Sequence, residues 1–227
     1  MTDFLATAAV APIVSGMTVG LGTGRAATRG IRALAERATA ERLTLLCVAT
    51  SARSRELATQ LGLRVGDLQA VGQIDYLFDG ADEVDPLLRM IKGRGGAMTR
   101  EKRVAHAARR RVYLIQSDKL VERLGQTALL PIEAAAEQLS GVHAALQSLG
   151  LQGQDRRNDD GGLYRTDGGN PVIDAKLLAD FDVAALAQAL DRMPGVVGHG
   201  LFLTEADEVL VENEAGEVSR KGKPSAT

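Results

Sequence analysis

The stretch between residues 79 and 102 concentrates side chains that can move protons. Six of its groups suit acid–base chemistry or charge stabilisation, namely Asp79, Asp82, Glu83, Asp85, Lys92 and Glu101. Carboxylates held close together raise one another's pKa values, and acid–base enzymes use that effect. Glycines at 93, 95 and 96 let the backbone approach a ligand and let Lys92 point into a site. The pattern predicts acid–base chemistry on a small polar molecule. The alternative is a solvated acidic turn with a flexible loop, where Glu101 is only a helix-start acid.

A glycine-rich loop at residues 20–25 has the composition of an anion-binding turn. It reads Gly-Leu-Gly-Thr-Gly-Arg, follows a strand-like run and opens a helix, so its N–H groups can receive an anion. A dinucleotide fingerprint would need a third glycine at Arg25 and an acid where Thr50 and Ser51 stand. The sequence also lacks the Gly-Lys-Ser/Thr of a nucleotide loop. A small phosphate or a sugar oxygen is the better ligand, and a plain strand-to-helix turn is the alternative.

Thr50 and Ser51 form a second loop of similar character. They end a buried strand and precede a helix, where hydroxyl side chains usually act as caps. In an open α/β sheet, however, loops that follow neighbouring parallel strands face one crevice, where ligands bind. We therefore expect this loop and the loop at residues 20–25 to serve one site.

The elements that must position these side chains alternate in the first half of the chain. Strand-like runs at 17–21, 43–49, 74–78 and 111–115 alternate with helical patterns at 26–40, 53–61 and 99–109. Such alternation predicts βαβ units and a mostly parallel sheet. An apolar first helix followed by a turn precedes them, rather than a targeting segment.

The order of elements changes after residue 126. We expect a strand at 129–134, a helix at 137–149, a polar loop or hairpin at 154–162, strands at 163–166 and 172–173, a helix at 183–193 and a strand at 195–203. This β-α-β-β-α-β order is typical of a ferredoxin-like module. The predicted domains are therefore 1–126 plus 205–227, and 127–204. Within the first, we expect a terminal hairpin at 208–219 and a frayed tail at 220–227.

Bulk composition excludes several classes of protein. The 227 residues are 45% hydrophobic and 25% charged, with net charge -2 and only 3% aromatic residues. Nucleic-acid binding is disfavoured, because it calls for a basic domain and stacking aromatics. The apolar N-terminal stretch is too short and interrupted to span a membrane. Cys47 is the single cysteine, so a reducing compartment is expected, and His106, His143 and His199 have no metal-ligand spacing.

Several ordered motifs resemble the type A ribose-5-phosphate isomerases over nearly the whole chain. They are GLGTG at 20–24, Thr50-Ser51, DGADEVD at 79–85, IKGRGGAMTREK at 91–102, SDKL at 117–120, LPIE at 130–133, TDGGNPVID at 166–174 and PGVVGHGLF at 194–202. The resemblance implies an α/β fold, with a Rossmann-like parallel-sheet domain and a smaller ferredoxin-like α+β domain. It further implies a cofactor-free, metal-free cytoplasmic enzyme that forms a homodimer or homotetramer.

The resemblance also implies the reaction and its residues. Ribose 5-phosphate and ribulose 5-phosphate would interconvert through an enediolate, with Glu101 as the base. Asp79 would serve ring opening, Asp82 would polarise hydroxyls and Lys92 would stabilise the oxyanion. The implied substrate-binding set is Gly22, Thr23, Gly24, Arg25, Thr50, Ser51, Asp79, Gly80, Asp82, Lys92, Gly93, Arg94, Gly95 and Lys119.

The departures from the family pattern gather at the phosphate end. Arg25-Ala26 stands where Ser-Thr is usual, Arg94 replaces a glycine, and no lysine precedes Lys92. We therefore hypothesise that Arg25, together with Arg94, binds the phosphate, since guanidinium binds phosphate bidentately. The alternatives are an isomerase of a related sugar phosphate or sugar acid, and a non-catalytic sensor of sugar phosphates.

Overall fold

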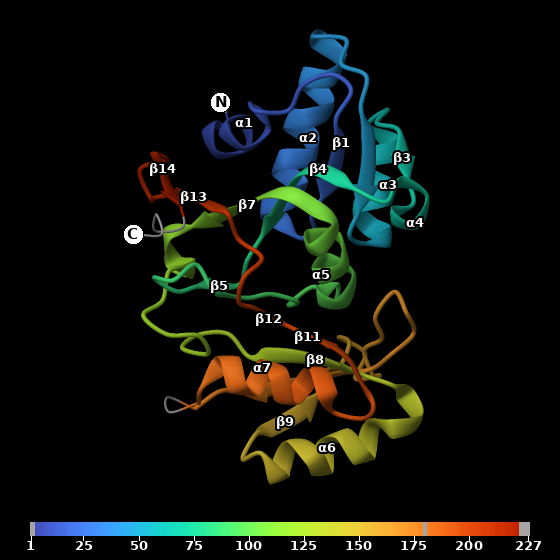
Figure 1. The fold of residues 1–227 in the computed structure, drawn as a ribbon, viewed down its shortest axis with the longest axis vertical. Coiled ribbons are helices and arrows are strands. Elements are labelled where there is room, and N and C mark those ends of the chain that lie inside the picture. The colour runs from blue at the N-terminus through green and yellow to red at the C-terminus, as the bar shows by residue number, and fades with distance from the viewer. Residues whose placement is uncertain (1–2, 179–180, 223–227) are drawn as a thin grey trace. The chain divides into compact units, whose positions relative to one another are not determined.

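The computed structural model describes residues 3–178 and 181–222, drawn in Figure 1. They form two compact units. The first unit contains the described residues up to Ala81, Arg100–Lys119 and those from Thr204 onward. The second unit contains Asp82–Thr99 and the described residues of Leu120–Leu203. No helix within the described ranges is long and apolar enough to cross a membrane.

The first unit is built on a seven-stranded sheet of order β14-β13-β7-β4-β1-β2-β3. Its strands are β1 (Thr18–Leu21), β2 (Leu46–Ala49), β3 (Val65–Gly66), β4 (Ile74–Gly80), β7 (Ala108–Gln116), β13 (Glu208–Glu212) and β14 (Val218–Gly222). All pairs are parallel except β13 with β14. From β1 the chain builds the sheet outward through β2 and β3, and it then returns to build the other side from β4. The sheet therefore has its topological switch point between β1 and β4.

Helices cover both faces of this sheet. They are α1 (Phe4–Val10), α2 (Arg25–Ala40), α3 (Ala52–Gln60), α4 (Leu68–Val71) and α5 (Met98–Ala107). Leu77 and Phe78 are neighbours in β4 and so point to opposite faces. A Cβ on Gly30 of α2 would lie 2.6 Å from the Phe78 ring. A Cβ on Gly20 would meet Leu77 at 2.8 Å and Val104 of α5 at 3.1 Å. Helices α2 and α5 therefore lie on opposite faces.

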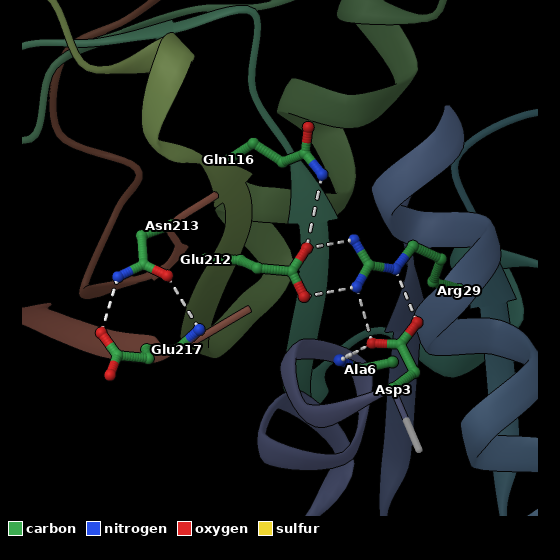
Figure 2. A network of polar contacts seen from close by, with 7 residues as sticks. All are labelled: Asp3, Ala6, Arg29, Gln116, Glu212, Asn213 and Glu217. Carbon is green, nitrogen blue, oxygen red and sulfur yellow. Dashed lines mark hydrogen bonds and ion pairs between the residues drawn. The ribbon is translucent and has the colours of Figure 1, made fainter. Parts of the chain in front are cut away.

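An arginine links three distant segments of the first unit, as Figure 2 shows. The Arg29 guanidinium on α2 donates to both carboxylate oxygens of Asp3, at 2.6 and 2.7 Å, and to both of Glu212, at 2.8 and 2.9 Å. Asp3 also caps α1, because its side chain accepts the Ala6 N–H. The N-terminal helix, α2 and the end of β13 are thus joined through one side chain.

The second unit contains the predicted β-α-β-β-α-β module. Its elements are β8 (Leu130–Ala134), α6 (Leu139–Ser148), β9 (Gln152–Asp155), β10 (Val172–Lys176), α7 (Val183–Arg192) and β11 (Val196–His199). The strands form an antiparallel sheet of order β11-β8-β10-β9. Apolar residues of α6 and α7 pack with those of β8 and β10 in one core. A small sheet of β5 (Glu83–Val84), β6 (Met90–Ile91) and β12 (Leu201–Phe202) belongs to the same unit. The predicted fold class is confirmed.

Several element boundaries differ from the expectations. Residues 163–166 form isolated bridges instead of a strand, and β9 forms within a polar segment because one side of β10 needs a partner strand. The expected strand at 195–203 breaks at Gly200, whose N–H donates to the Pro131 carbonyl at 2.8 Å. Only the first part of the predicted tail, up to Gly222, lies in β14, and residues 223–227 lie outside the described residues.

The two units also divide the chain differently from the predicted domains. Residues 82–99 and 120–126 lie in the second unit. Two sets of contacts explain why these segments belong to the second unit. Strand β6 pairs with β12 of that unit. The buried Glu83 carboxylate also accepts the N–H groups of Gly125, Thr127 and Ala128, which links residues 82–99 to the segment around residue 126.

Candidate active site

Asp79 lies where the switch point predicts a ligand site, at the carboxyl end of β4. Its side chain is fully buried, and its Oδ1 accepts the Thr23 N–H at 2.9 Å and the Gly80 N–H at 2.7 Å. The Gly22 N–H donates to the Phe78 carbonyl at 2.9 Å, which holds the β1 loop against β4. The glycine loop and the predicted catalytic acid therefore meet directly.

Four hydroxyl side chains form a cluster beside this loop, which we call the hydroxyl cluster: Thr23, Thr50, Ser51 and Ser54. The Thr23 hydroxyl lies 2.7 Å from the Thr50 hydroxyl and donates to Ser51 Oγ at 2.8 Å. Ser54 Oγ donates to the Gly22 carbonyl at 2.6 Å. The two predicted loops are thus joined by hydrogen bonds, as expected from their places after neighbouring strands.

The cap interpretation of Ser51 holds as well, because Ser51 Oγ accepts the Ser54 N–H at the start of α3. Sequence reasoning did not single out Ser54. Its place three residues after the cap was the available signal, since that position meets the cap side chain.

Glu101 lies in the first turn of α5 and is 4% exposed. It is close enough to Tyr113 of β7 that its carboxylate, like that of Asp79, contributes to raising the pKa of the Tyr113 phenol. Burial of the phenol is the larger cause of that rise. Glu101 and Asp79 thus share a neighbour on the α5 face of the sheet, and sequence reasoning did not identify Tyr113.

Arg25 begins α2 and extends from the glycine loop. Gly24 precedes it as the N-cap with φ of +96°, a conformation that favours glycine. Arg25 is exposed, and within the part of the chain that the structure describes its guanidinium makes no ion pair. A cation at this helix start is available for an anion, which the N–H groups of the first turn also favour.

Lys119 ends a short 3-10 helix, Ser117–Lys119, that follows β7 at the same sheet edge. Its ammonium donates to Asp118 Oδ2 at 2.9 Å. The first unit therefore collects most of the predicted set at or near the carboxyl ends of its parallel strands: Gly22, Thr23, Gly24, Arg25, Thr50, Ser51, Asp79, Gly80, Glu101 and Lys119.

The second unit carries the remaining predicted residues, beginning with Asp82 and Lys92. The Asp82 carboxylate accepts the Arg94 N–H at 3.0 Å. Lys92 is 2% exposed, and its ammonium lies 5.6 Å from the centre of the Phe202 ring. At that distance the aromatic face attracts the cation. Phe202 lies within the PGVVGHGLF motif, but sequence reasoning gave it no role.

The loop of Gly93, Arg94, Gly95 and Gly96 is held in shape by residues from a distant hairpin. Arg156 Nη1 donates to the carbonyls of Gly93 and Arg94, each at 3.0 Å. The same side chain pairs with Asp174, with Nε to Oδ2 at 2.8 Å and Nη2 to Oδ1 at 2.5 Å. The Tyr164 hydroxyl donates to the Gly95 carbonyl at 3.1 Å. No local sequence pattern indicates these contacts, because the hairpin reads as an ordinary polar segment.

Two of the four clustered acids have structural roles. Glu83 holds the chain around residues 125–128 through its N–H acceptor bonds. Asp85 accepts the N–H groups of Leu87 and Arg89 and the Arg89 guanidinium. Glu83 and Asp85 are therefore explained by turn structure, and Asp79 and Asp82 remain as the candidates for chemistry. Within the described residues no group of three or more His, Cys, Asp or Glu side chains could hold a metal ion.

Known proteins show which family has this arrangement. The model of the family described as ribose 5-phosphate isomerase A (phosphoriboisomerase A) matches residues 46–216. The chain is 42% identical to ribose-5-phosphate isomerase A of Thermomicrobium roseum over 205 residues, covering 90% of this chain and 86% of that protein.

Two solved structures agree over the whole fold. Ribose 5-phosphate isomerase A of Methanocaldococcus jannaschii has a TM-score of 0.92 and 37% identity, and the match covers 96% of each chain. A D-ribose-5-phosphate isomerase in complex with phospho-erythronic acid also has a TM-score of 0.92, with 33% identity and coverage of 97% of this chain and 96% of that one. The resemblance predicted from the sequence motifs is confirmed, and the chain belongs to the ribose-5-phosphate isomerase A family.

Proposed function

We propose that this protein interconverts ribose 5-phosphate and ribulose 5-phosphate. The observation that carries the proposal is the family match, together with the presence of the complete acid–base set Asp79, Asp82, Lys92 and Glu101. The related isomerase with a bound phosphorylated sugar acid supports a sugar phosphate as the ligand class.

In this mechanism Glu101 takes the proton from C2 of the open-chain aldose and returns it to C1. The C2–H electron pair moves into the C1–C2 bond, and the carbonyl oxygen O1 becomes the enediolate oxygen. The hydroxyl proton of O2 then passes to O1, and as C1 takes up the proton from Glu101 the C1–C2 π electrons are used for the new C1–H bond while O2 forms the C2 carbonyl. Glu101 is buried, so it meets little competition from solvent protons. Lys92 stabilises the developing oxyanion, and such electrostatic stabilisation is worth ~3–4 kcal/mol.

Asp79 assists ring opening by exchanging a proton with the ring oxygen or the anomeric hydroxyl. The Thr23 and Gly80 N–H groups fix Oδ1, so the carboxylate has a defined orientation. Asp82 binds substrate hydroxyls, and its carboxylate is oriented by the Arg94 N–H. Lys119, which follows β7, is the second lysine assigned to the substrate.

The reaction is tested by NMR of ribose 5-phosphate in D2O. The proposal predicts that deuterium enters C1 or C2 as the aldose and ketose interconvert. Glu101→Gln should retain substrate binding but exchange deuterium several orders of magnitude more slowly than the wild type. A non-catalytic sensor would show no exchange even in the wild type. If ribose 5-phosphate does not exchange while another sugar phosphate or sugar acid does, the substrate assignment is wrong.

The phosphate end carries a further part of the proposal, in which Arg25 binds the phosphate. Its exposed guanidinium makes no ion pair among the described residues and extends from the N-terminus of α2. Arg94, exposed in the second unit, is the second candidate. The hydroxyl cluster, which includes Thr23 of the same loop as Arg25, supplies neutral hydrogen-bonding groups in the first unit.

We predict that Arg25→Ala raises KM for ribose 5-phosphate at least tenfold, because a charged hydrogen bond contributes about 1.5–3 kcal/mol. Its kcat should change much less. Arg32→Ala is the matched control, since Arg32 is exposed on the same helix about two turns further on. Steady-state kinetics decide the matter, and an unchanged KM in Arg25→Ala contradicts the assignment.

We further propose that the chain acts in the cytoplasm as a homodimer or homotetramer, as its family resemblance implies. A single cysteine, which can form no disulfide within the chain, is consistent with a reducing compartment. Burial raises the pKa of the Cys47 thiol to about 12, which keeps it unreactive. Sedimentation equilibrium measures the oligomeric state, and a monomer at micromolar concentration contradicts that part.

A further inference from the structure

A buried glutamate of β8 accepts hydrogen bonds from three side chains, and no step above uses it. Glu133 is 4% exposed. Its Oε1 accepts the Thr166 hydroxyl at 2.8 Å and the Asn170 side-chain amide at 2.9 Å, and its Oε2 accepts the Thr99 hydroxyl. Burying a carboxylate is costly unless hydrogen bonds compensate it. Here neutral donors from two segments distant from β8 in sequence supply those bonds.

The turn at residues 166–170 is shaped so that it presents two of these donors. The Thr166 N–H donates to the Asn170 carbonyl at 2.9 Å. Thr166 Oγ1 also accepts the N–H groups of Gly168 and Asn170, at 3.2 and 3.3 Å. The turn therefore fixes the Oε1 side of the Glu133 carboxylate, and this orientation directs Oε2 to Thr99.

Thr99 lies at the start of the helix that carries the proposed base. It is the second residue of α5, and Glu101 follows two positions later in the first turn. Gly198 of β11 also lies against Thr99, because a Cβ on Gly198 would be 2.3 Å from Thr99 Oγ1. Gly198 is in turn the register partner of Glu133 across β11 and β8. The start of α5 is thus held on these two strands by a hydrogen bond and a close contact.

We infer that Glu133 is a positioning residue for Glu101, and that it acts through the Thr99 hydroxyl on the first turn of α5. Thr99 and Glu133 both belong to the second unit, and the regular backbone of α5 carries the constraint to Glu101. A base must lie close to the proton that it takes, and even a small displacement lowers the rate. The inference rests on the proposed isomerase function.

Thr99→Val tests this role, because valine has nearly the size and helix propensity of threonine but lacks the hydroxyl. We expect kcat for ribose 5-phosphate to fall by about tenfold to a hundredfold, since a misplaced base slows proton transfer. KM should stay near the wild-type value, because neither Thr99 nor Glu133 is assigned a contact with substrate. Thr99→Ala, which is smaller and cannot crowd Gly198, should show the same loss. Thr99→Ser, which keeps the hydroxyl, should retain most of the wild-type kcat.

Thr166→Val is the matched control, because it removes a donor to the other oxygen of the same carboxylate and leaves the Thr99 bond in place. Urea unfolding should show that both valine variants are less stable than the wild type but folded under assay conditions. Thr166→Val should nevertheless keep the wild-type kcat.

Two results would overturn the inference. Wild-type kcat in both Thr99→Val and Thr99→Ala would show that the bond to Glu133 does not position the base. A loss of kcat in Thr166→Val or Thr99→Ser as large as that in Thr99→Val would show that general destabilisation lowers the rate. If the wild type catalyses no exchange with ribose 5-phosphate, the proposed function itself fails, which is a distinct result.

Discussion

Gly22 is required by a close contact rather than by its backbone conformation. A Cβ at this position would lie 2.1 Å from Asp79 Oδ1, a distance that no carbon atom can occupy. Gly24, two residues later, has open space for a Cβ but has φ of +96°. The two glycines of one loop therefore serve different purposes: the first admits the carboxylate and the second turns the chain into α2.

Gly22→Ala is predicted to displace the Asp79 carboxylate and so to lower kcat. A misplacement of about 1 Å can cost on the order of a hundredfold in rate, and the overpacking should reduce stability by about 1–3 kcal/mol. Gly216→Ala is the control, because Gly216 has a φ of +80° in open space in the β13–β14 turn. That variant should lose about 1–2 kcal/mol through backbone strain alone and keep kcat. Wild-type kcat in Gly22→Ala would contradict the contact argument.

Among the elements, the loop at residues 93–96 depends on a hairpin distant in sequence. Arg156 satisfies two of its carbonyls and pairs with Asp174, and its side chain is largely buried. We predict that Arg156→Ala destabilises the second unit by about 2–3 kcal/mol, because it leaves these acceptors without their charged donor. It should also raise KM, since the loop carries proposed substrate contacts.

Arg157→Ala serves as the control for that prediction. Arg157 is the next residue and donates to the Gly161 carbonyl within its own hairpin. Urea unfolding and steady-state kinetics should show a change of less than about 0.5 kcal/mol and an unchanged KM for this variant. Equal effects of the two substitutions would mean that the hairpin, rather than the link to the loop, is being measured.

The difference between these elements also explains how far the sequence could predict them. The strand–helix alternation was readable because each buried strand is a short apolar run, such as the residues of β2, and the motifs identified Asp79, Lys92 and Glu101. Arg156 and Gly93 are 63 positions apart, and nothing local marks either as a partner. Tyr113 reads as one more apolar strand residue, and only the β4–β7 register brings it opposite Asp79. The sequence alone therefore could not predict which residues pair across distant strands or which residues hold a loop in place. The local pattern of apolar runs and helical segments was sufficient to predict the fold class.

At the scale of the whole molecule, the chain closes its first unit by returning to it after residue 203. Glu212, at the end of β13, meets Arg29 and through it Asp3 (Figure 2). We predict that Arg29→Ala lowers the free energy of unfolding by about 1–2 kcal/mol, less than for a fully buried pair because solvent partly screens these charges. Arg32→Ala, on the exposed side of the same helix, should change it by less than about 0.5 kcal/mol.

The stabilisation by Arg29 should depend on pH in a defined direction. Hydrogen bonds from Arg29 hold the pKa values of Asp3 and Glu212 below their ordinary values of 3.8 and 4.5. A carboxyl whose pKa is lower in the folded state stabilises the protein above its unfolded pKa, and this contribution is lost as pH falls through the folded value. The difference in unfolding free energy between wild type and Arg29→Ala should therefore be constant from about pH 7 to 5 and shrink below about pH 4. Urea unfolding of both proteins across this range measures it, and a difference that persists undiminished at pH 3 would show that Arg29 stabilises the unit through packing rather than charge.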